Sequence, residues 1–274
     1  MQHFTSVSDV GNLEALLQTA KKVKKKPHAD RKLGRKRTLG CIFFNPSLRT
    51  RMSTQRAAFN LGMNVIVMNV GTEGWKLEFA DGAVMNAGSA EHIKDAAAVM
   101  GLYCDILAIR SFAGLENREE DYAEEVMEAF KKYSDAPIIS LESATLHPCQ
   151  SLADLITIEQ YKKQEKPKVL LTWAPHPRAL PQAVANSFAE WCIRAGYQLR
   201  VSHPPGYALN ERFVPNEFVD TDPEAAWADA DFVYAKNWSS YEDYGSILST
   251  DPAWMVTPGK IRQTNDAFSC IACP

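Results

Sequence analysis

Short apolar runs rich in β-branched residues alternate with amphipathic stretches along most of the chain. In the first half these runs predict strands and helices in the order 38–44, 47–62, 63–70, 90–103, 104–110, 119–133, 136–142 and 149–163. The alternation starts again with 166–173, 182–196, 197–204, 223–230 and 231–238. Gly62 follows the first helix, where we expect a left-handed cap. This rhythm is typical of parallel sheets built from βαβ units.

Two series of this kind within 274 residues indicate two α/β domains. We expect each domain to be a doubly wound parallel sheet, with a cleft between the two. The polar segment KKQEK at 162–166 precedes the second series. The boundary is therefore predicted within 143–165, with the helix at 149–163 as a bridge, which gives domains at 1–145 and 146–274.

Composition narrows the class of protein without naming a partner. A net charge of -3 with 46% hydrophobic and 23% charged residues is that of an ordinary globular protein. The amino terminus lacks a signal-peptide pattern and no apolar window approaches the ~20 residues of a membrane span, so we expect a cytoplasmic protein without a membrane partner. The lysine run at 21–26 lacks interleaved aromatic residues, and we interpret it as a solvated helix end rather than a nucleic-acid site. The six cysteines are expected to be reduced and mostly buried.

Polar residues cluster where the predicted strands end, which is where open α/β sheets bind their ligands. The first strand leads into FNPSLRTR at 44–51, and a helix opening at Ser47 would point backbone N–H groups at an anion. Ser47 and Thr50 add hydroxyl groups, and Arg49 and Arg51 add planar donors suited to phosphate. The segment lacks the Gly-rich loop and lysine of a nucleotide P-loop. It indicates a phosphate site, although a capping serine beside solvated arginines would give the same spacing.

Further strand ends carry Arg110, Glu142 with HPCQ at 147–150, APHPR at 174–178, and KNW at 236–238. SLRTR, Arg110 and HPCQ, in this order and separation, resemble the carbamoyl-phosphate site of the aspartate and ornithine carbamoyltransferase family. The resemblance extends over about residues 35 to 268. It implies an active site in the cleft between a carbamoyl-phosphate domain and a second-substrate domain, with no cofactor and no metal.

The resemblance also implies roles at the carbamoyl-phosphate site. Arg49, Arg110 and His147 would be the catalytic residues, with Arg110 and His147 polarising the carbonyl group. Trp75 would be donated to the site of a neighbouring subunit in a homotrimer, and Gln150 would accept from the carbamoyl NH₂. The full set of carbamoyl-phosphate residues would be Ser47, Leu48, Arg49, Thr50, Trp75, Arg110, His147, Pro148, Cys149 and Gln150.

The second substrate is implied by Trp75, Glu142, His176 and Lys236, which resemble the branch of the family that acts on N-acylated ornithines. The Ser-Met-Gly motif of the ornithine branch is absent from 235–245. Glu142, His176 and Lys236 would bind the acylornithine, whose δ-amine would receive the carbamoyl group in arginine biosynthesis. Each also has an ordinary interpretation: a packed aromatic ring for Trp75, salt bridges for Glu142 and Lys236, and a loop histidine for His176.

The acyl group depends on Ala90. In this branch the matching position is glutamate in the acetyl enzymes and proline in the succinyl enzymes, and a carboxylate there would repel a succinyl group. Ala90 lacks that charge, and the segment 174–184 is closer to the succinyl type. We therefore predict N-succinylornithine as substrate, with N-acetylornithine as the alternative.

The end of the sequence departs from the family pattern. Where the family has His-Cys-Leu-Pro followed by a long helix, this chain reads TNDAFSCIACP at 264–274. A shifted reading frame can encode Met-His-Cys-Leu-Pro here, so we hypothesise a base lost near the codon of Phe268, which the coding DNA would test.

Two alternative functions remain: a non-catalytic remnant that binds carbamoyl phosphate, and a dinucleotide-binding oxidoreductase. The second lacks any Gly-x-Gly-x-x-Gly after a strand.

Overall fold

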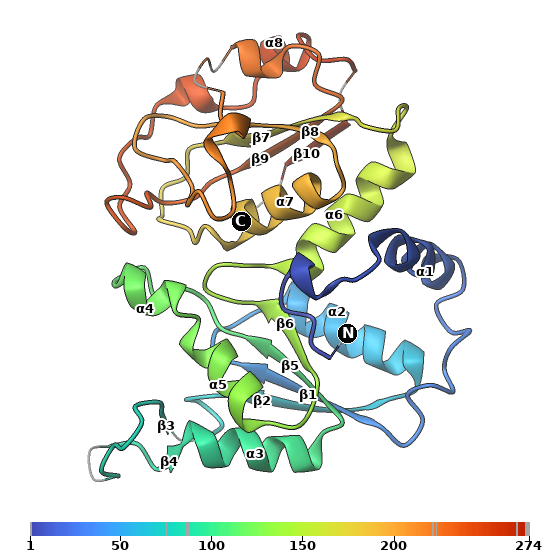
Figure 1. Cartoon of the computed structure of the whole chain (residues 1–274), viewed down its shortest axis with the longest axis vertical. Helices are drawn as coiled ribbons and strands as arrows, with labels where there is room; N and C mark the ends of the chain where they lie inside the picture. The colour runs from blue at the N-terminus through green and yellow to red at the C-terminus, as the bar shows by residue number, and fades with distance from the viewer. Residues whose placement is uncertain are drawn as a thin grey trace. The chain divides into compact units, whose positions relative to one another are not determined.

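The computed structural model describes residues 2–74, 76–85, 88–220, 222, 224–266 and 268–271, with side chains as far as 266. The chain forms two compact units (Figure 1). Unit 1 comprises Met1–Ala113 and Glu120–Ala144, and unit 2 comprises Gly114–Glu119 and Thr145–Pro274. The excursion into unit 2 is fixed by Arg118, whose Nη1 donates to the carbonyl oxygen of Tyr241 at 3.3 Å. No apolar periodicity marks this segment, so a single cut in the sequence could not reveal it.

Unit 1 is built on a parallel sheet with the strand order β2-β1-β5-β6. Its strands are β1 (Thr38–Phe43), β2 (Asn64–Asn69), β5 (Ile106–Arg110) and β6 (Ile138–Glu142), with a small ladder of β3 (Leu77–Glu78) and β4 (Glu91–His92). The helices are η1 (Val7–Asp9), α1 (Leu13–Lys25), α2 (Arg49–Leu61), α3 (Ile93–Tyr103), α4 (Arg118–Tyr122), whose first two residues belong to unit 2, and α5 (Glu125–Tyr133). The single helix predicted at 119–133 is wrong. It is divided because Glu124 has a φ of 53°, in the left-handed region that an α-helix cannot include.

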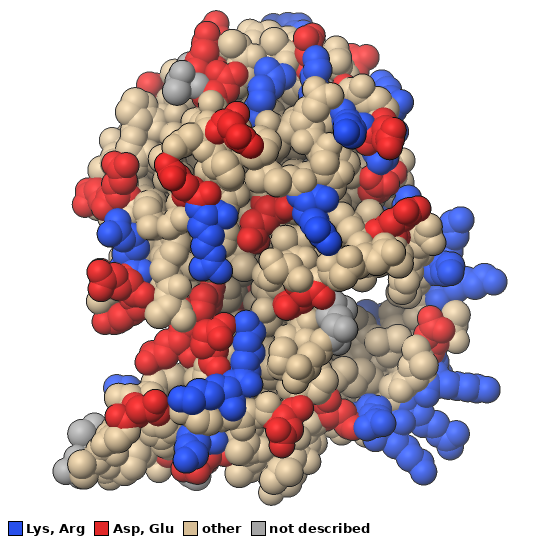
Figure 2. All heavy atoms as spheres, in the orientation of Figure 1, with Lys and Arg blue, Asp and Glu red and all other residues tan. Residues whose placement is uncertain are grey.

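Helices cover both faces of this sheet, as predicted for a doubly wound domain. Buried side chains such as Ile42 and Ile109 pack against α3 and α5, where Phe130 is fully buried. Phe43 follows Ile42 and so faces the opposite side, where the guanidinium of Arg51 on α2 lies over its ring. The lysine run forms the exposed last turn of α1, as predicted, and Figure 2 shows basic side chains projecting from this part of unit 1.

Gly62 ends α2 in the predicted left-handed conformation, with a φ of 79°. A Cβ atom at this position would also lie 2.3 Å from the carbonyl oxygen of Arg31. We expect Gly62→Ala to lower the free energy of unfolding by about 1–2 kcal/mol or more, measured by urea denaturation. Gly11→Ala is the matched control, because a Cβ there meets nothing within 4 Å and its φ lies outside the left-handed region. Equal effects of the two substitutions would contradict this account of the cap.

Unit 2 is built on a second parallel sheet, with the order β10-β9-β7-β8. Its strands are β7 (Lys168–Trp173), β8 (Gln198–Ser202), β9 (Phe232–Lys236) and β10 (Phe268–Ile271). Its helices are α6 (Pro148–Tyr161), α7 (Ala183–Arg194), α8 (Pro258–Ile261), η2 (Asn216–Phe218), η3 (Ala225–Trp227) and η4 (Pro252–Trp254). The full helix predicted at 223–230 is wrong, since the described residues of this segment form only the single 3₁₀ turn η3. Ala228 lies directly after this turn and leaves the helical conformation with a ψ of 129°, and Asp229 follows it with a left-handed φ of 57°.

The second sheet is also covered on both faces. Trp227 of η3 packs on Leu170 and Val233, whereas Phe188 of α7 stacks on Tyr234, with 4.2 Å between ring centroids. Tyr234 follows Val233 along β9 and therefore faces the other side. The predicted α/β architecture with two parallel sheets is thus confirmed.

Two further predictions can be compared with the described residues. Cys41, Cys104 and Cys192 are buried and Cys149 is half-buried, and all four are free thiols, as predicted. The side chains of Cys270 and Cys273 lie outside the described part of the chain. Among the helices that the structure describes, none combines the length and apolar character needed to cross a bilayer.

Candidate functional site

Each sheet reverses its strand order at one point, and open α/β sheets bind ligands at such switch points. In unit 1 the chain runs from β1 to β2 on one side and then to β5 and β6 on the other, so the switch lies between β1 and β5. There the last residue of β1, Phe43, is paired with Arg110. In unit 2 the switch lies between β7 and β9, where Trp173 is paired with Lys236. The predicted site residues Arg110 and Lys236 therefore stand at the two switch points.

The start of α2 lies directly after the unit 1 switch point, because β1 ends at Phe43 and a short loop leads into the helix. The sequence predicts that the helix begins at Ser47, but it begins at Arg49. Ser47 stays outside because its Oγ accepts from the backbone N–H of Thr50 at 3.2 Å. That bond occupies one of the N–H groups predicted to face an anion. The remaining positive end of the helix and the exposed Arg49 still favour an anion here.

The spacing of Arg51 predicts that its guanidinium donates to a phosphate, but the structure directs this group to the strand ends. Its Nη1 donates to Oδ1 of Asn69 at 3.0 Å, and its guanidinium lies 5.9 Å from the centroid of the Phe43 ring. Asn69 is the last residue of β2 and is paired with Phe43. Arg51 therefore ties α2 to the ends of β1 and β2.

Arg110 is the most constrained of the predicted site residues, with only 7% of its surface exposed. Its Nη2 donates to Oε2 of Glu142 at 3.1 Å, and its Nη1 donates to the carbonyl oxygens of Pro46 at 2.6 Å and Asn45 at 3.4 Å. The guanidinium also lies 3.9 Å from the centroid of the Phe112 ring. Arg110 therefore fixes the loop that leads into SLRTR as well as standing at the switch point.

Within the described part of the chain these bonds use three of the five N–H donors of Arg110, so two donors form no hydrogen bond there. One of them is Nε, which is buried and makes no hydrogen bond within the described part of the chain. Burial lowers the pKa of the guanidinium, and the Glu142 carboxylate opposes that shift. Arg110 remains a cation at neutral pH, because an arginine side chain is effectively always protonated.

A register shift aligns Glu142 with Arg110. Ile109 pairs with Ser140, but the next residue of β5, Arg110, pairs with Glu142, so Leu141 is passed over. Such a bulge re-aims side chains, and here it places the carboxylate on the same row as the guanidinium. The ordinary salt-bridge interpretation of Glu142 is thus observed in the structure, beside its predicted role in substrate binding.

The HPCQ segment forms the start of α6. His147 is the N-cap residue and Pro148 occupies the first turn. Burial raises the pKa of the Cys149 thiol to about 12, so it stays protonated at neutral pH and is unsuited to act as a nucleophile. Gln150 Nε2 donates to Oδ1 of Asp154, one turn further along the helix, at 2.9 Å.

His176 and Lys236 lie on neighbouring segments at the other switch point. Lys236 is buried and ends β9, and its carbonyl oxygen accepts from the N–H of Ala174 at 3.1 Å. Nδ1 of His176 accepts from the N–H of Arg178 at 3.0 Å, which turns the ring onto its own loop. Asn237 Nδ2 donates to the carbonyl oxygen of Ala174 at 2.7 Å and joins the two segments.

The acyl-specificity position, Ala90, is exposed just before β4, and its N–H donates to the carbonyl oxygen of Lys76 at 3.3 Å. Trp75 lies outside the described residues, as does the end of the chain at 272–274. Sequence reasoning missed Asn45, Asn69 and Asp154. Asn45 and Asn69 could have been found by their position at the ends of strands, but nothing local marks Asp154.

The chain is similar throughout to known proteins. A family model described as "Aspartate/ornithine carbamoyltransferase, carbamoyl-P binding domain" matches residues 2–160. The N-succinylornithine carbamoyltransferase of Bacteroides fragilis is 52% identical over 276 residues, covering 100% of this chain and 87% of that protein. The N-acetylornithine carbamoyltransferase of Xanthomonas campestris pv. campestris is 34% identical over 297 residues, covering 100% and 87%. A solved structure of a mutant N-acetyl-L-ornithine transcarbamylase complexed with carbamyl phosphate and N-succinyl-L-norvaline has a TM-score of 0.90 and 32% identity, covering 100% of this chain and 89% of its own.

Proposed function

Since the chain belongs to the aspartate/ornithine carbamoyltransferase family, we propose that it transfers the carbamoyl group of carbamoyl phosphate to the δ-amine of N-succinyl-L-ornithine. The observation that carries this proposal is the 52% identity over the whole chain to an N-succinylornithine carbamoyltransferase, against 34% to an N-acetylornithine carbamoyltransferase. The products would be the acylated citrulline and phosphate. The reaction is a step of arginine biosynthesis.

The phosphate group is assigned to the start of α2. The backbone N–H groups of Ser47 and Leu48 and the hydroxyl groups of Ser47 and Thr50 would bind its oxygens, and Arg49 would add charge-assisted hydrogen bonds. The exposure of Arg49 and the positive end of the helix support this assignment. Trp75 would complete the site from a neighbouring subunit.

The carbamoyl group is assigned to Arg110 and to the HPCQ segment. The two remaining N–H donors of Arg110, together with His147, would polarise the carbonyl oxygen as the amine nitrogen attacks its carbon. The C–N bond then forms, the bond from carbon to the phosphate oxygen breaks, and the phosphate takes the amine proton. Gln150 Oε1 would accept from the carbamoyl NH₂, beside the backbone of Pro148 and Cys149.

The acylornithine is assigned to Glu142, His176 and Lys236. Support comes from the position of Lys236 at the switch point of its sheet and from the bonds that join its segment to the loop of His176. Glu142 would bind this substrate and also pair with Arg110. Loss of the first role would weaken substrate binding, whereas loss of the second would lower the stability of the ligand-free protein.

The charge at position 90 is expected to decide between the succinyl and acetyl substrates. We expect Ala90→Glu to lower the ratio of kcat/KM for N-succinylornithine over that for N-acetylornithine by about tenfold or more, because the added carboxylate repels the succinyl carboxylate. Ala90→Gln is the matched control of similar size without charge and should change the ratio much less. Equal changes in the two variants would point to bulk rather than charge.

The activity itself is tested by citrulline formation from carbamoyl phosphate with N-succinylornithine, N-acetylornithine and ornithine in separate reactions. We expect the highest kcat/KM with N-succinylornithine. A higher kcat/KM for N-acetylornithine would establish the alternative substrate. Binding of carbamoyl phosphate without product from any amine would instead favour the non-catalytic alternative.

We also propose a homotrimer in which Trp75 is shared between subunits. Support comes from exposed apolar side chains at the N-cap of α2 (Leu48), on α2 (Met52 and Phe59) and on the edge strand β2 (Ile66). Size-exclusion chromatography with light scattering measures the assembly, and a stable, active monomer would count against it.

A further inference from the structure

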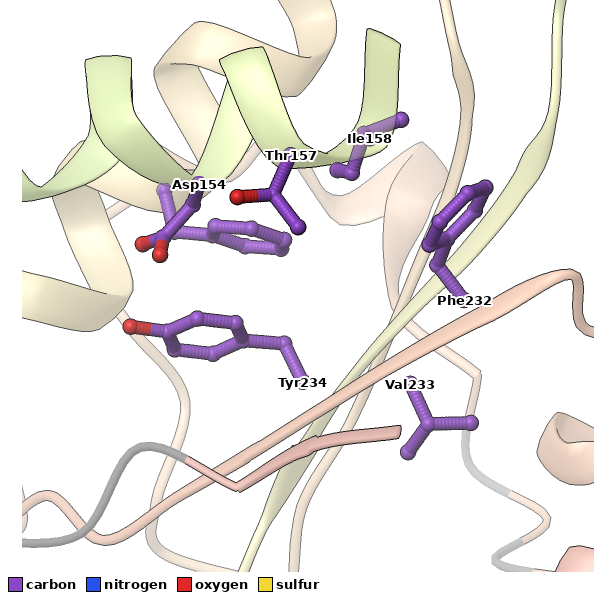
Figure 3. A pocket seen from close by; sticks show the side chains of 7 residues that line it. Asp154, Thr157, Ile158, Phe232, Val233 and Tyr234 are labelled. Atoms are coloured by element: carbon purple, nitrogen blue, oxygen red, sulfur yellow. The ribbon is translucent and has the colours of Figure 1, made fainter. Parts of the chain in front are cut away.

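Asp154 is a buried carboxylate on α6 whose surroundings are mostly apolar. It is 8% exposed and lines a cavity of about 20 Å³ together with Ile158, Phe188, Phe232 and Val233 (Figure 3). No Lys or Arg side chain contributes to the charge environment of this carboxylate within the described ranges. A buried carboxylate without a cation is costly, so its presence calls for a reason.

The only side chain on its own helix that hydrogen bonds to Asp154, among the described residues, is Gln150, at 2.9 Å between Nε2 and Oδ1. An ionised carboxylate has no proton to donate and can only accept. The Gln150 amide must therefore present its NH₂ group to Asp154. This leaves the amide oxygen, Oε1, as the group that a ligand at the start of α6 would meet.

We propose that Asp154 is a positioning residue that orients the Gln150 amide so that Oε1 accepts from the NH₂ of the carbamoyl group. The inference rests on the proposed function, in which Gln150 binds that group. A flipped amide would place its own NH₂ against the carbamoyl NH₂, and two donors cannot form a hydrogen bond. A purely structural role would be served as well by an apolar side chain, because the cavity around Asp154 is largely apolar.

The groups that face Asp154 come from three elements. Gln150 and Thr157 belong to α6, Phe188 and Cys192 to α7, and Tyr234 to β9. Figure 3 shows the Tyr234 hydroxyl on the same side of the cavity as the Asp154 carboxylate. Burial raises the pKa of Asp154 to about 6, while Gln150 and Tyr234 oppose that shift. The carboxylate is thus ionised above about pH 6, and orients Gln150 there, but is protonated and able to donate below it.

The decisive experiment is a double-mutant cycle. We expect Asp154→Leu to lower kcat/KM for carbamoyl phosphate about tenfold, because the Gln150 amide loses the hydrogen bond that orients it. The urea midpoint should not fall, because the substitution removes an uncompensated buried charge. Asp154→Asn should lose less, since its carbonyl oxygen can still accept. In the Gln150→Ala background, Asp154→Leu should have little further effect. Thr157→Ala, which lines the same cavity, is the control and should retain the activity.

Additive losses in this cycle, or unchanged activity in Asp154→Leu, would overturn the proposal. If Asp154→Leu does not fold, the wild type and Asp154→Asn suffice. The penalty of Asp154→Asn should shrink as the pH falls through about 6, because the wild type then loses its orienting carboxylate; a penalty that is constant with pH would contradict the inference.

A readout independent of activity separates this proposal from the proposed function. In ¹⁵N-labelled wild-type protein, the side-chain amide resonance of Gln150 should titrate near pH 6, and it should not do so in Asp154→Asn. A chain that shows this titration but transfers no carbamoyl group would refute the proposed function and leave the orientation of Gln150 intact. A Gln150 resonance that does not titrate would refute the orientation, whatever the activity.

Discussion

Arg110→Lys is expected to lower kcat about 10²–10³-fold while the protein remains folded. In other enzymes, the loss of one preorganised donor to a developing oxyanion has an effect of this size. A lysine keeps the positive charge beside Glu142, but its compact ammonium group cannot reach Glu142 and the carbonyl oxygen of Pro46 while also donating to a ligand. The measurement is kcat at saturating concentrations of both substrates, with circular dichroism and urea denaturation to verify the fold.

Arg37→Lys provides the matched control for this substitution. Arg37 pairs with Asp105 next to the opposite, amino-terminal ends of β1 and β5, and its side chain is 62% exposed. We expect this variant to keep the wild-type kcat, since the pair is far along the strands from the switch point. If Arg110→Lys also kept the wild-type kcat, Arg110 would be a structural clamp of the loop before α2 and not a catalytic residue.

The strands and most helices could be predicted because each is specified locally. Apolar β-branched runs such as TLGCIFF form strands buried on both faces, and Gly62 adopts the one conformation at a helix end that other residues avoid. The predicted helix at 119–133 failed because Glu124 adopts a left-handed conformation that its residue type does not signal. The predicted helix at 223–230 failed because the backbone leaves the helical conformation at Ala228, directly after η3, and an alanine does not signal such an end.

The sequence could predict where the site residues lie along their strands, but not which groups their side chains contact. Placing Arg110 and Lys236 at strand ends was enough to put them at switch points. Which groups they contact depends on pairs distant in sequence, such as Arg51 with Asn69, and on the bulge that opposes Arg110 to Glu142. Neither a side-chain direction nor a skipped residue in a ladder leaves a local trace in composition or periodicity.

Glu142→Ala is expected to lower the free energy of unfolding by about 3–5 kcal/mol in the absence of any substrate. The carboxylate is 7% exposed and is the only acidic partner of Arg110 among the described residues. Its removal would therefore leave a buried guanidinium uncompensated. Urea denaturation of the ligand-free protein measures the effect. A residue that only bound the acylornithine would leave the stability of the ligand-free protein nearly unchanged, so this outcome separates the two roles of Glu142.

The double variant Arg110→Leu with Glu142→Leu tests whether the stability lost in Glu142→Ala comes from the unpaired Arg110 guanidinium, whatever the size of that loss. Replacing both members of a buried ion pair by apolar residues is often neutral or stabilising, whereas breaking the pair is not. We therefore expect the double variant to recover most of the stability lost in Glu142→Ala while transferring no carbamoyl group. Recovery of stability without activity would mean that the pair is retained for its chemistry and its positioning of the loop before α2. A double variant as unstable as Glu142→Ala would mean that the bulged end of β6 needs this carboxylate for folding itself.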